Sequence, residues 1–118
     1  MQRYLGKRKE LRIYISNEDT YEGKPLFEAL LSLAKEKELA GATVVKAVAG
    51  LGVHSEIHSF NVWVLKQKVP LIVTMIDTEE KIRRYLEAAG EMIAEGLVTM
   101  SDTEVVQYHH PKFDNGEA

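Results

Sequence analysis

The first clear pattern in the chain is an alternation of apolar and polar residues. Residues 11–16 read Leu-Arg-Ile-Tyr-Ile-Ser, which predicts a strand with one buried face. A turn-rich stretch over residues 17–23 ends this strand. Pro25 suits the first position of a helix, which we expect over residues 25–38. The buried face of this helix is expected to hold Leu26, Phe27, Leu30, Leu33 and Ala34.

Two further strands are predicted in the middle of the chain. Gly41 marks the end of the first helix, and the valine-rich residues 42–49 predict a second strand. Residues 69–76 are apolar at odd and even positions apart from Thr74, which indicates a third strand covered on both faces. Pro70 must lie at the start of that strand, where a missing N–H group is tolerated.

A second helix and a last strand complete the pattern. Residues 77–80 read Asp-Thr-Glu-Glu, which predicts a helix start with Asp77 as N-cap and Glu80 reaching back to it. Gly96 suits a left-handed residue beyond the end of the helix. Residues 97–108, broken near Ser101-Asp102, predict the last strand. The buried face of the second helix is expected to hold Ile82, Leu86, Ala89 and Ile93.

The order β-α-β-loop-β-α-β predicts an α+β fold of the ferredoxin-like type. In this arrangement two helices cover one face of a four-stranded antiparallel sheet. The other face is then bare, although the third strand still offers it apolar side chains: Ile72 and Ile76, or Leu71, Val73 and Met75, depending on the register. A symmetric homo-oligomer would cover this face.

An eighteen-residue connection over residues 51–68 separates the second and third strands. Hairpins ordinarily use two to five residues, and a longer connection is usually functional or disordered. This one contains one acidic residue, Glu56, and opens with Gly50-Leu51-Gly52. Its apolar side chains predict a surface that docks on a partner protein. The residues expected to dock are Ile57, Phe60, Trp63 and Leu65.

Composition predicts one domain over residues 1–118, because this length with 45% hydrophobic residues provides one core. Five of the first twelve residues are basic and one is acidic, so we expect a basic N-terminal arm over residues 1–10. A flexible tail is expected over residues 111–118. The N-terminus lacks the apolar segment of a signal peptide, and no apolar run approaches the ~20 residues that span a bilayer. We therefore expect a soluble cytoplasmic protein.

The histidines and serines give little support for a metal site or an enzyme. His54 and His58 are four residues apart, but Glu56 and the distant His109 and His110 are the only further ligands in view, and a zinc site needs three or four. The serines lie in no recognisable nucleophile motif. Nucleic acid is not an expected partner, because the chain is acidic overall and its third strand lacks aromatic residues.

Several short motifs together resemble one family. Gly41-Ala42-Thr43-Val44, then Gly50-Leu51-Gly52 and a long loop, then Gly96-Leu97-Val98-Thr99 before the last strand, are similar to the PII signalling superfamily. Arg12-Ile13-Tyr14-Ile15 and Gly23-Lys24-Pro25-Leu26 make the chain most similar to the uncharacterised PII-like proteins of unknown function. The resemblance spans about residues 7–108.

The resemblance implies a non-enzymatic homotrimer that binds an adenine nucleotide between subunits as an effector, with no obligatory cofactor. The long loop would correspond to the T-loop, which docks on an unidentified protein such as a membrane transporter or an enzyme. The residues that match nucleotide-contacting positions of PII proteins are Gly41, Thr43, Gly50, Gly52, Gly96, Leu97 and Val98.

The chain departs from the PII pattern at three cations. Leu97 follows the last glycine where PII proteins have a phosphate-binding lysine, and Tyr108 and His110 replace two arginines. Substitute contacts could come from Lys7, Lys9, Arg12, Lys46, His54 and His58. A ligand with fewer charges than ATP, such as AMP, ADP or a cyclic nucleotide, is then plausible. Two alternatives remain open: a trimeric metal-binding or metal-tolerance protein, which would use His54, Glu56 and His58, and an enzyme with its site between subunits.

Overall fold

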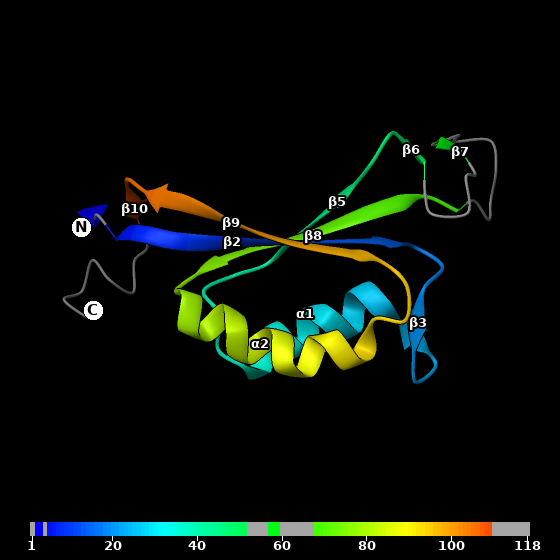
Figure 1. The fold of residues 1–118 in the computed structure, drawn as a ribbon, viewed down its shortest axis with the longest axis horizontal. Helices are drawn as coiled ribbons and strands as arrows, with labels where there is room; N and C mark the ends of the chain where they lie inside the picture. Colours follow the sequence, from blue (N-terminus) through cyan, green and yellow to red (C-terminus); the bar gives the residue numbers. More distant parts are fainter. Residues whose placement is uncertain (1, 4, 52–56, 60–67, 110–118) are drawn as a thin grey trace.

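The computed structural model describes residues 2–3, 5–51, 57–59 and 68–109. Two helices lie against one face of an antiparallel four-stranded sheet (Figure 1), so the predicted ferredoxin-like α+β fold is confirmed. The sheet has the order β5-β8-β2-β9. Its strands are β2 (Gly6–Ser16), β5 (Thr43–Lys46), β8 (Pro70–Asp77) and β9 (Leu97–Val105), and its helices are α1 (Leu26–Glu36) and α2 (Glu79–Met92).

Three short ladders extend this framework. They pair β1 (Gln2–Arg3) with β10 (Tyr108–His109), β3 (Thr20–Tyr21) with β4 (Lys24–Pro25), and β6 (Ala49–Leu51) with β7 (Ile57–Ser59). The predicted second strand over residues 42–49 is therefore divided between β5 and β6. Part of the predicted connection over residues 51–68 also belongs to a ladder, since Leu51 is paired with Ile57.

The core lies between the helices and one face of the sheet. Alternate residues of β2 and β8 supply the sheet side, and the cross-strand pairs Leu11↔Met75 and Ile13↔Val73 lie at its centre. The hydroxyl of Tyr85 on α2 donates to the carbonyl oxygen of Leu30 on α1 at 2.8 Å. The two helices are thus joined by a buried hydrogen bond as well as by apolar packing. The buried residues of this cluster are Leu11, Ile13, Ile15, Leu26, Leu30, Ala34, Leu71, Val73, Met75, Ile82, Tyr85 and Ala89.

The first strand begins much earlier than its apolar pattern suggests. The prediction of a basic arm over residues 1–10 is wrong for residues 6–10, because β2 starts at Gly6 and pairs with β9 from Gly6↔Val105 onward. Residues 6–8 pair with β9 alone, and β8 joins β2 only from Lys9. A two-stranded ribbon outside the helix layer needs no alternating apolar face, so its sequence gives no strand signal.

The last strand is continuous where a break was expected. Ser101 and Asp102 lie inside β9 and pair with Glu10 and Lys9. The predicted break near Ser101-Asp102 is therefore wrong. The acidic side chain at position 102 is accommodated because its cross-strand neighbour is a lysine.

Both ends of the second helix differ from the prediction. Thr78, not Asp77, is the N-cap, and its side chain accepts from the amide of Lys81 at 3.3 Å. The Asp77 carboxylate instead accepts from the amides of Ala40 at 2.9 Å and Thr78 at 2.7 Å, and the residue is only 7% exposed. Asp77 therefore ties the start of α2 to the segment after α1.

Gly96 is not a helix cap, because α2 ends at Met92. It has a φ of +156°, and a Cβ atom placed on it would lie 2.8 Å from the carbonyl oxygen of Tyr14. The residue is glycine because the backbone of β2 passes too closely for any side chain.

The face of the sheet opposite the helices carries apolar side chains in one row across all four strands. Val45, Ile72, Tyr14 and Leu97 are cross-strand neighbours; Val45 is 49% exposed and Leu97 59%. Ile72 and Ile76 face this side, so the register left undecided by the sequence places Leu71, Val73 and Met75 in the core. We refer to this surface as the open face. Within the described segments, neither helix is long and apolar enough to span a membrane.

Candidate functional site

The predicted ligand-binding residues lie on opposite edges of the sheet. Gly41 and Thr43 belong to the approach and start of β5, whereas Leu97 and Val98 open β9 directly after Gly96. The order β5-β8-β2-β9 puts two strands between these edges. At about 4.8 Å per strand, the edges are about 14 Å apart. One chain therefore does not bring these two groups together around a small ligand.

The candidates also divide between the two ends of the sheet. Lys46 is paired with Leu71, and Leu97 with Tyr14, so both lie at the end where β6 and β7 leave the sheet (Figure 1). We call this the loop end. Lys9 is five residues from Tyr14 along β2, a distance of about 17 Å at about 3.4 Å per residue. Lys7 lies farther along β2 and Gly41 precedes β5, so these candidates belong to the opposite end.

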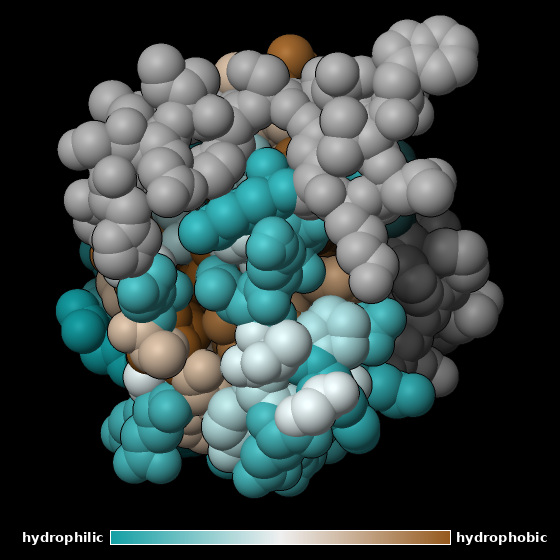
Figure 2. All heavy atoms as spheres, turned by 90° about the vertical axis from the view of Figure 1, so that its right-hand side faces the viewer, coloured by the Kyte–Doolittle hydropathy of each residue, from teal (hydrophilic) through white to brown (hydrophobic). Residues whose placement is uncertain are grey.

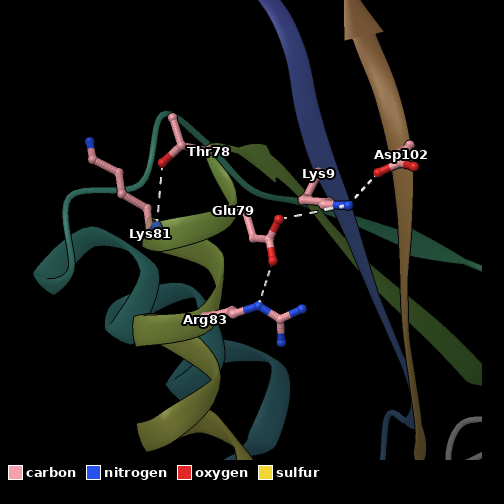
Figure 3. A network of polar contacts seen from close by, with 6 residues as sticks. All are labelled: Lys9, Thr78, Glu79, Lys81, Arg83 and Asp102. Atoms are coloured by element: carbon pink, nitrogen blue, oxygen red, sulfur yellow. Dashed lines mark hydrogen bonds and ion pairs between the residues drawn. The ribbon is translucent and has the colours of Figure 1, made fainter.

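At that opposite end, Lys9 is the centre of a polar network (Figure 3). Its Nζ atom bonds to Asp102 of β9 and lies 3.9 Å from Glu79 of α2, whose other carboxylate oxygen accepts from Arg83 at 2.8 Å. The hydrogen bond from Lys9 lowers the pKa of the Asp102 carboxyl, and the same bond raises the pKa of the Lys9 ammonium. Lys9 thus ties β2, β9 and α2 together, which argues against a role as a replacement phosphate ligand.

Arg12, another predicted substitute cation, is also paired within the chain. Its guanidinium lies 2.6 Å from a carboxylate oxygen of Glu10. Arg12 shares a cross-strand row with Thr74 and Thr99 on the open face, in the middle of the sheet rather than at either edge. Its charge is therefore balanced locally and away from the candidate glycines.

The base of the long connection is well defined on both sides. On the first side, β6 and β7 pair through Gly50↔His58, and the amide of Ala47 donates to the carbonyl oxygen of Pro70 at 2.9 Å. On the second side, the amide of Val69 donates to the Asn17 side chain at 2.7 Å, and the amide of Asn17 donates back to the Val69 carbonyl oxygen at 3.0 Å. The connection therefore starts and ends on fixed backbone.

Figure 2 views the molecule from the loop end. Hydrophilic side chains occupy the middle of the described surface, and hydrophobic surface is visible between and beside them. At the same end, the start of β9 presents two exposed apolar side chains, Leu97 and Val98. Apolar side chains beside backbone amides suit the base and ribose of a nucleotide better than its phosphates.

Several predicted residues lie outside the described part of the chain. They are Gly52, His54, Glu56, Phe60, Trp63, Leu65 and His110. Ile57 and His58 are placed by their backbone in β7. The docking role of the loop therefore stays a prediction. Among residues 2–3, 5–51, 57–59 and 68–109, no three His, Asp or Glu side chains are grouped so as to hold a metal ion.

Two residues at the loop end were missed by the sequence reasoning. Asn17 was assigned only to a turn, and Lys68 only to the end of the connection. Lys68 is half-buried and directly precedes Val69, which Asn17 holds. A lysine on each side of the connection, Lys46 before it and Lys68 at its end, was the available signal.

Comparison with known proteins identifies relatives over most of the chain. The sequence profile of the family DUF190, described as an uncharacterized ACR, matches residues 8–105. A UPF0166 protein of Aquifex aeolicus is 44% identical over 100 residues, covering 85% of this chain and 94% of that protein. A UPF0166 protein of Methanocaldococcus jannaschii is 33% identical over 100 residues, covering 84% and 92%.

Among solved structures, the chain is similar to CPII, a nitrogen regulatory PII-like protein from Thiomonas intermedia K12 that was solved bound to ADP, AMP and bicarbonate. The TM-score is 0.66 at 18% sequence identity, and the match covers 85% of this chain and 89% of CPII. At this identity the likeness concerns the fold.

Proposed function

The chain belongs to the DUF190 family (UPF0166) and has a PII-like fold, and from this premise we propose that it is a nucleotide-responsive regulatory protein of the cytoplasm rather than an enzyme. Its effector would be an adenine nucleotide, AMP, ADP, ATP or a cyclic nucleotide, bound between subunits of a homotrimer. The connection over residues 51–68 would transmit the bound state to a partner protein such as a transporter or an enzyme. The solved complex of CPII with ADP and AMP supports this choice of ligand.

The observation that carries the proposal is the split of the candidate residues between the two edges of the sheet. Neighbouring strands are antiparallel throughout the order β5-β8-β2-β9, so the two edge strands run in opposite directions. A second copy of the chain can be generated by rotation about an axis parallel to the strands. In that arrangement β9 of one copy lies antiparallel to β5 of the next. Such a heterologous contact forms a ring when the rotation closes, and it would bring Leu97 of one subunit beside the β5 edge of its neighbour.

The open face supports the same assembly. A monomer would leave Val45 and Leu97 in water at the two ends of an apolar row that continues through Ile72 and Tyr14. Side chains exposed in a contiguous patch of this kind mark a protein contact. A trimer with its sheets facing inward would cover the row.

Two carboxylates at the start of α2, Asp77 and Glu79, are engaged by other groups of the chain and are poor candidates for catalysis. Both oxygens of Asp77 accept backbone amides. Glu79 is engaged by Arg83 and Lys9, and its hydrogen bond from Arg83 lowers its pKa. A carboxylate whose pKa is lowered by fixed partners, as that of Glu79 is, is poorly suited to general acid–base chemistry near neutral pH.

Calorimetric titration with AMP, ADP, ATP and cyclic AMP tests the proposal. We expect at least one nucleotide to bind with heat and to raise the melting temperature, because a ligand that binds only the folded protein stabilises it by mass action. A protein that responds to none of the four would contradict the proposed function. The same titrations with divalent metal ions in place of nucleotide test the alternative that the protein binds metal.

The role of the loop needs a separate experiment. Deletion of residues 54–64 with a short glycine-containing closure should leave the domain folded, since long surface loops contribute little to stability. Capture of the partner from a cell extract should then be lost. Trp63, the only tryptophan, provides a second readout: strong blue-shifted fluorescence in the free protein would indicate packing in the core and contradict docking.

A further inference from the structure

Several Lys and Arg side chains in the described part of the chain are already engaged within it. Lys9 and Arg12 are paired as described above, and Arg8 donates to the carbonyl oxygens of Leu5 at 2.7 Å and Lys7 at 2.9 Å. Further intramolecular contacts of this kind join Lys81 to the carbonyl oxygen of Glu38 at 3.2 Å, Arg83 to Glu79, and Arg84 to Glu80. These contacts favour other residues as ligands for an anion.

Three further lysines lie away from the loop end. Lys7 lies on the ribbon beyond Lys9. Lys35 and Lys37 lie in and after the last turn of α1, close to Ala40, whose amide bonds to Asp77 at the end of β8. All three therefore belong to the end of the sheet that carries the Lys9 network, far from the starts of β6 and β9.

Two lysines flank the base of the connection at the loop end. Lys46 is exposed and ends β5 opposite Leu71. Lys68 is half-buried at the far end of the connection, and no ion pair joins it to another described residue. Its position is fixed by the next residue, Val69, whose two backbone polar groups are bonded to Asn17.

From this arrangement we infer that Lys68 neutralises the phosphates of the nucleotide and thereby replaces the cations missing at Leu97, Tyr108 and His110. This inference rests on the proposed function. An ammonium group is a suitable point-charge ligand for phosphate. Because Asn17 fixes the backbone beside Lys68, less conformational entropy is lost when its side chain engages the ligand. The exposed apolar side chain of Leu97, contributed by the neighbouring subunit, would contact the uncharged part of the ligand.

The inference predicts that Lys68 sets the preference between nucleotides with one and three phosphates. Calorimetric titrations with AMP and ATP would be made on the full chain and on Lys68→Gln and Lys24→Gln. Lys24 is an exposed lysine of β4 and is the matched control. We expect Lys68→Gln to weaken ATP binding about tenfold or more, the effect of losing one charged hydrogen bond. AMP binding should weaken less, and the Lys24 variant should behave like the parent.

The outcomes are distinguishable. Unchanged ATP affinity in Lys68→Gln, with nucleotide binding intact in the parent, would overturn the inference and leave the proposed function standing. An equal loss for AMP and ATP would also overturn it, because it would indicate that the substitution acts through the fold. A parent protein that binds neither nucleotide would reject the proposed function and the inference together. Melting curves without ligand establish that each variant is folded.

Discussion

Asn17 holds Val69 at both of its backbone polar atoms: the Val69 amide donates to the Asn17 side chain at 2.7 Å, and its carbonyl oxygen accepts from the Asn17 amide at 3.0 Å. The two residues are fifty-two positions apart in the chain. The turn after β2 therefore fixes the end of the long connection. This contact links the rigid sheet to the segment expected to carry the regulatory signal.

Replacement of Asn17 should destabilise the protein measurably. Val69 is only 3% exposed, so Asn17→Ala leaves its amide without a partner, at a cost of about 1–3 kcal/mol. The urea midpoint should fall while the m-value stays constant. Asn17→Asp keeps the acceptor oxygen and is the control. Equal stability of the alanine variant and the parent would show that the side-chain bond contributes nothing.

The end of α1 predicts a stabilising substitution. The amides of Glu38 and Leu39 donate to the carbonyl oxygens of Lys35 and Ala34, which is the Schellman motif, and Glu38 occupies its left-handed position with φ of +58°. Glycine fits that conformation without strain, so Glu38→Gly should raise the stability by about 0.5–1 kcal/mol. Lys37 has an ordinary φ of −83°, and Lys37→Gly should instead be destabilising.

The close approach of β9 to β2 predicts that Gly96 is intolerant of substitution. A methyl group at this position would lie 2.8 Å from the backbone oxygen of Tyr14, and relief of such overpacking costs about 1–3 kcal/mol. Gly90 of α2 is the matched control, because a Cβ atom there meets nothing within 4 Å. Gly90→Ala should gain about 1 kcal/mol from helix propensity. Chemical denaturation of both variants measures the contrast.

The Lys9 network predicts a pH-dependent contribution to stability. The pKa values of Asp102 and Glu79 are lowered in the folded state by their hydrogen bonds from Lys9 and Arg83. Their contribution is therefore present above the ordinary carboxyl range near pH 4 and is lost as the pH falls through the lowered values. The pKa of Lys9 is raised by Asp102, so its contribution is present below its ordinary value and is lost as the pH rises through the raised one.

Asp102→Asn tests this linkage. The melting temperature of the variant should lie below that of the parent at neutral pH, and the two should converge at low pH. The difference should also shrink in high salt, because these groups are exposed. Glu91→Gln, on α2 outside the network, serves as the comparison. A constant difference across the acid range would argue against a role for the Asp102 charge.

The sequence was sufficient to locate the third strand of the fold, because its residues form a continuous apolar run. The third strand, predicted over residues 69–76, is β8 (Pro70–Asp77), with Pro70 at its start as expected. The sequence could not decide which parity of β8 faces the helices, because both are apolar. Ribbon residues 6–8 gave no strand signal, since strand alternation requires a buried face and this segment has none.

The candidate site could be predicted only in outline. The glycine positions and the long connection follow from local sequence, but the partners of the cations do not. Lys9 and Asp102 are ninety-three positions apart, and only the register of β2 with β9 places them together. Sequence reasoning therefore offered Lys9 and Arg12 as phosphate ligands and missed Lys68, whose place depends on a contact with Asn17.

Assembly through the open face predicts that a charge in its apolar row will separate the subunits. The parent should have three times the 13.3 kDa chain mass in light scattering at micromolar concentration. Val45 is 49% exposed in the single chain and would be covered in the trimer, so Val45→Glu buries an unpaired charge on assembly. We expect this variant to remain folded and to have the mass of one chain.

Val106 is 64% exposed and lies beyond the end of β9, so the control variant Val106→Glu should remain trimeric. A parent protein with the mass of one chain, or a Val45 variant as trimeric as the parent, would show that the open face is not the subunit interface.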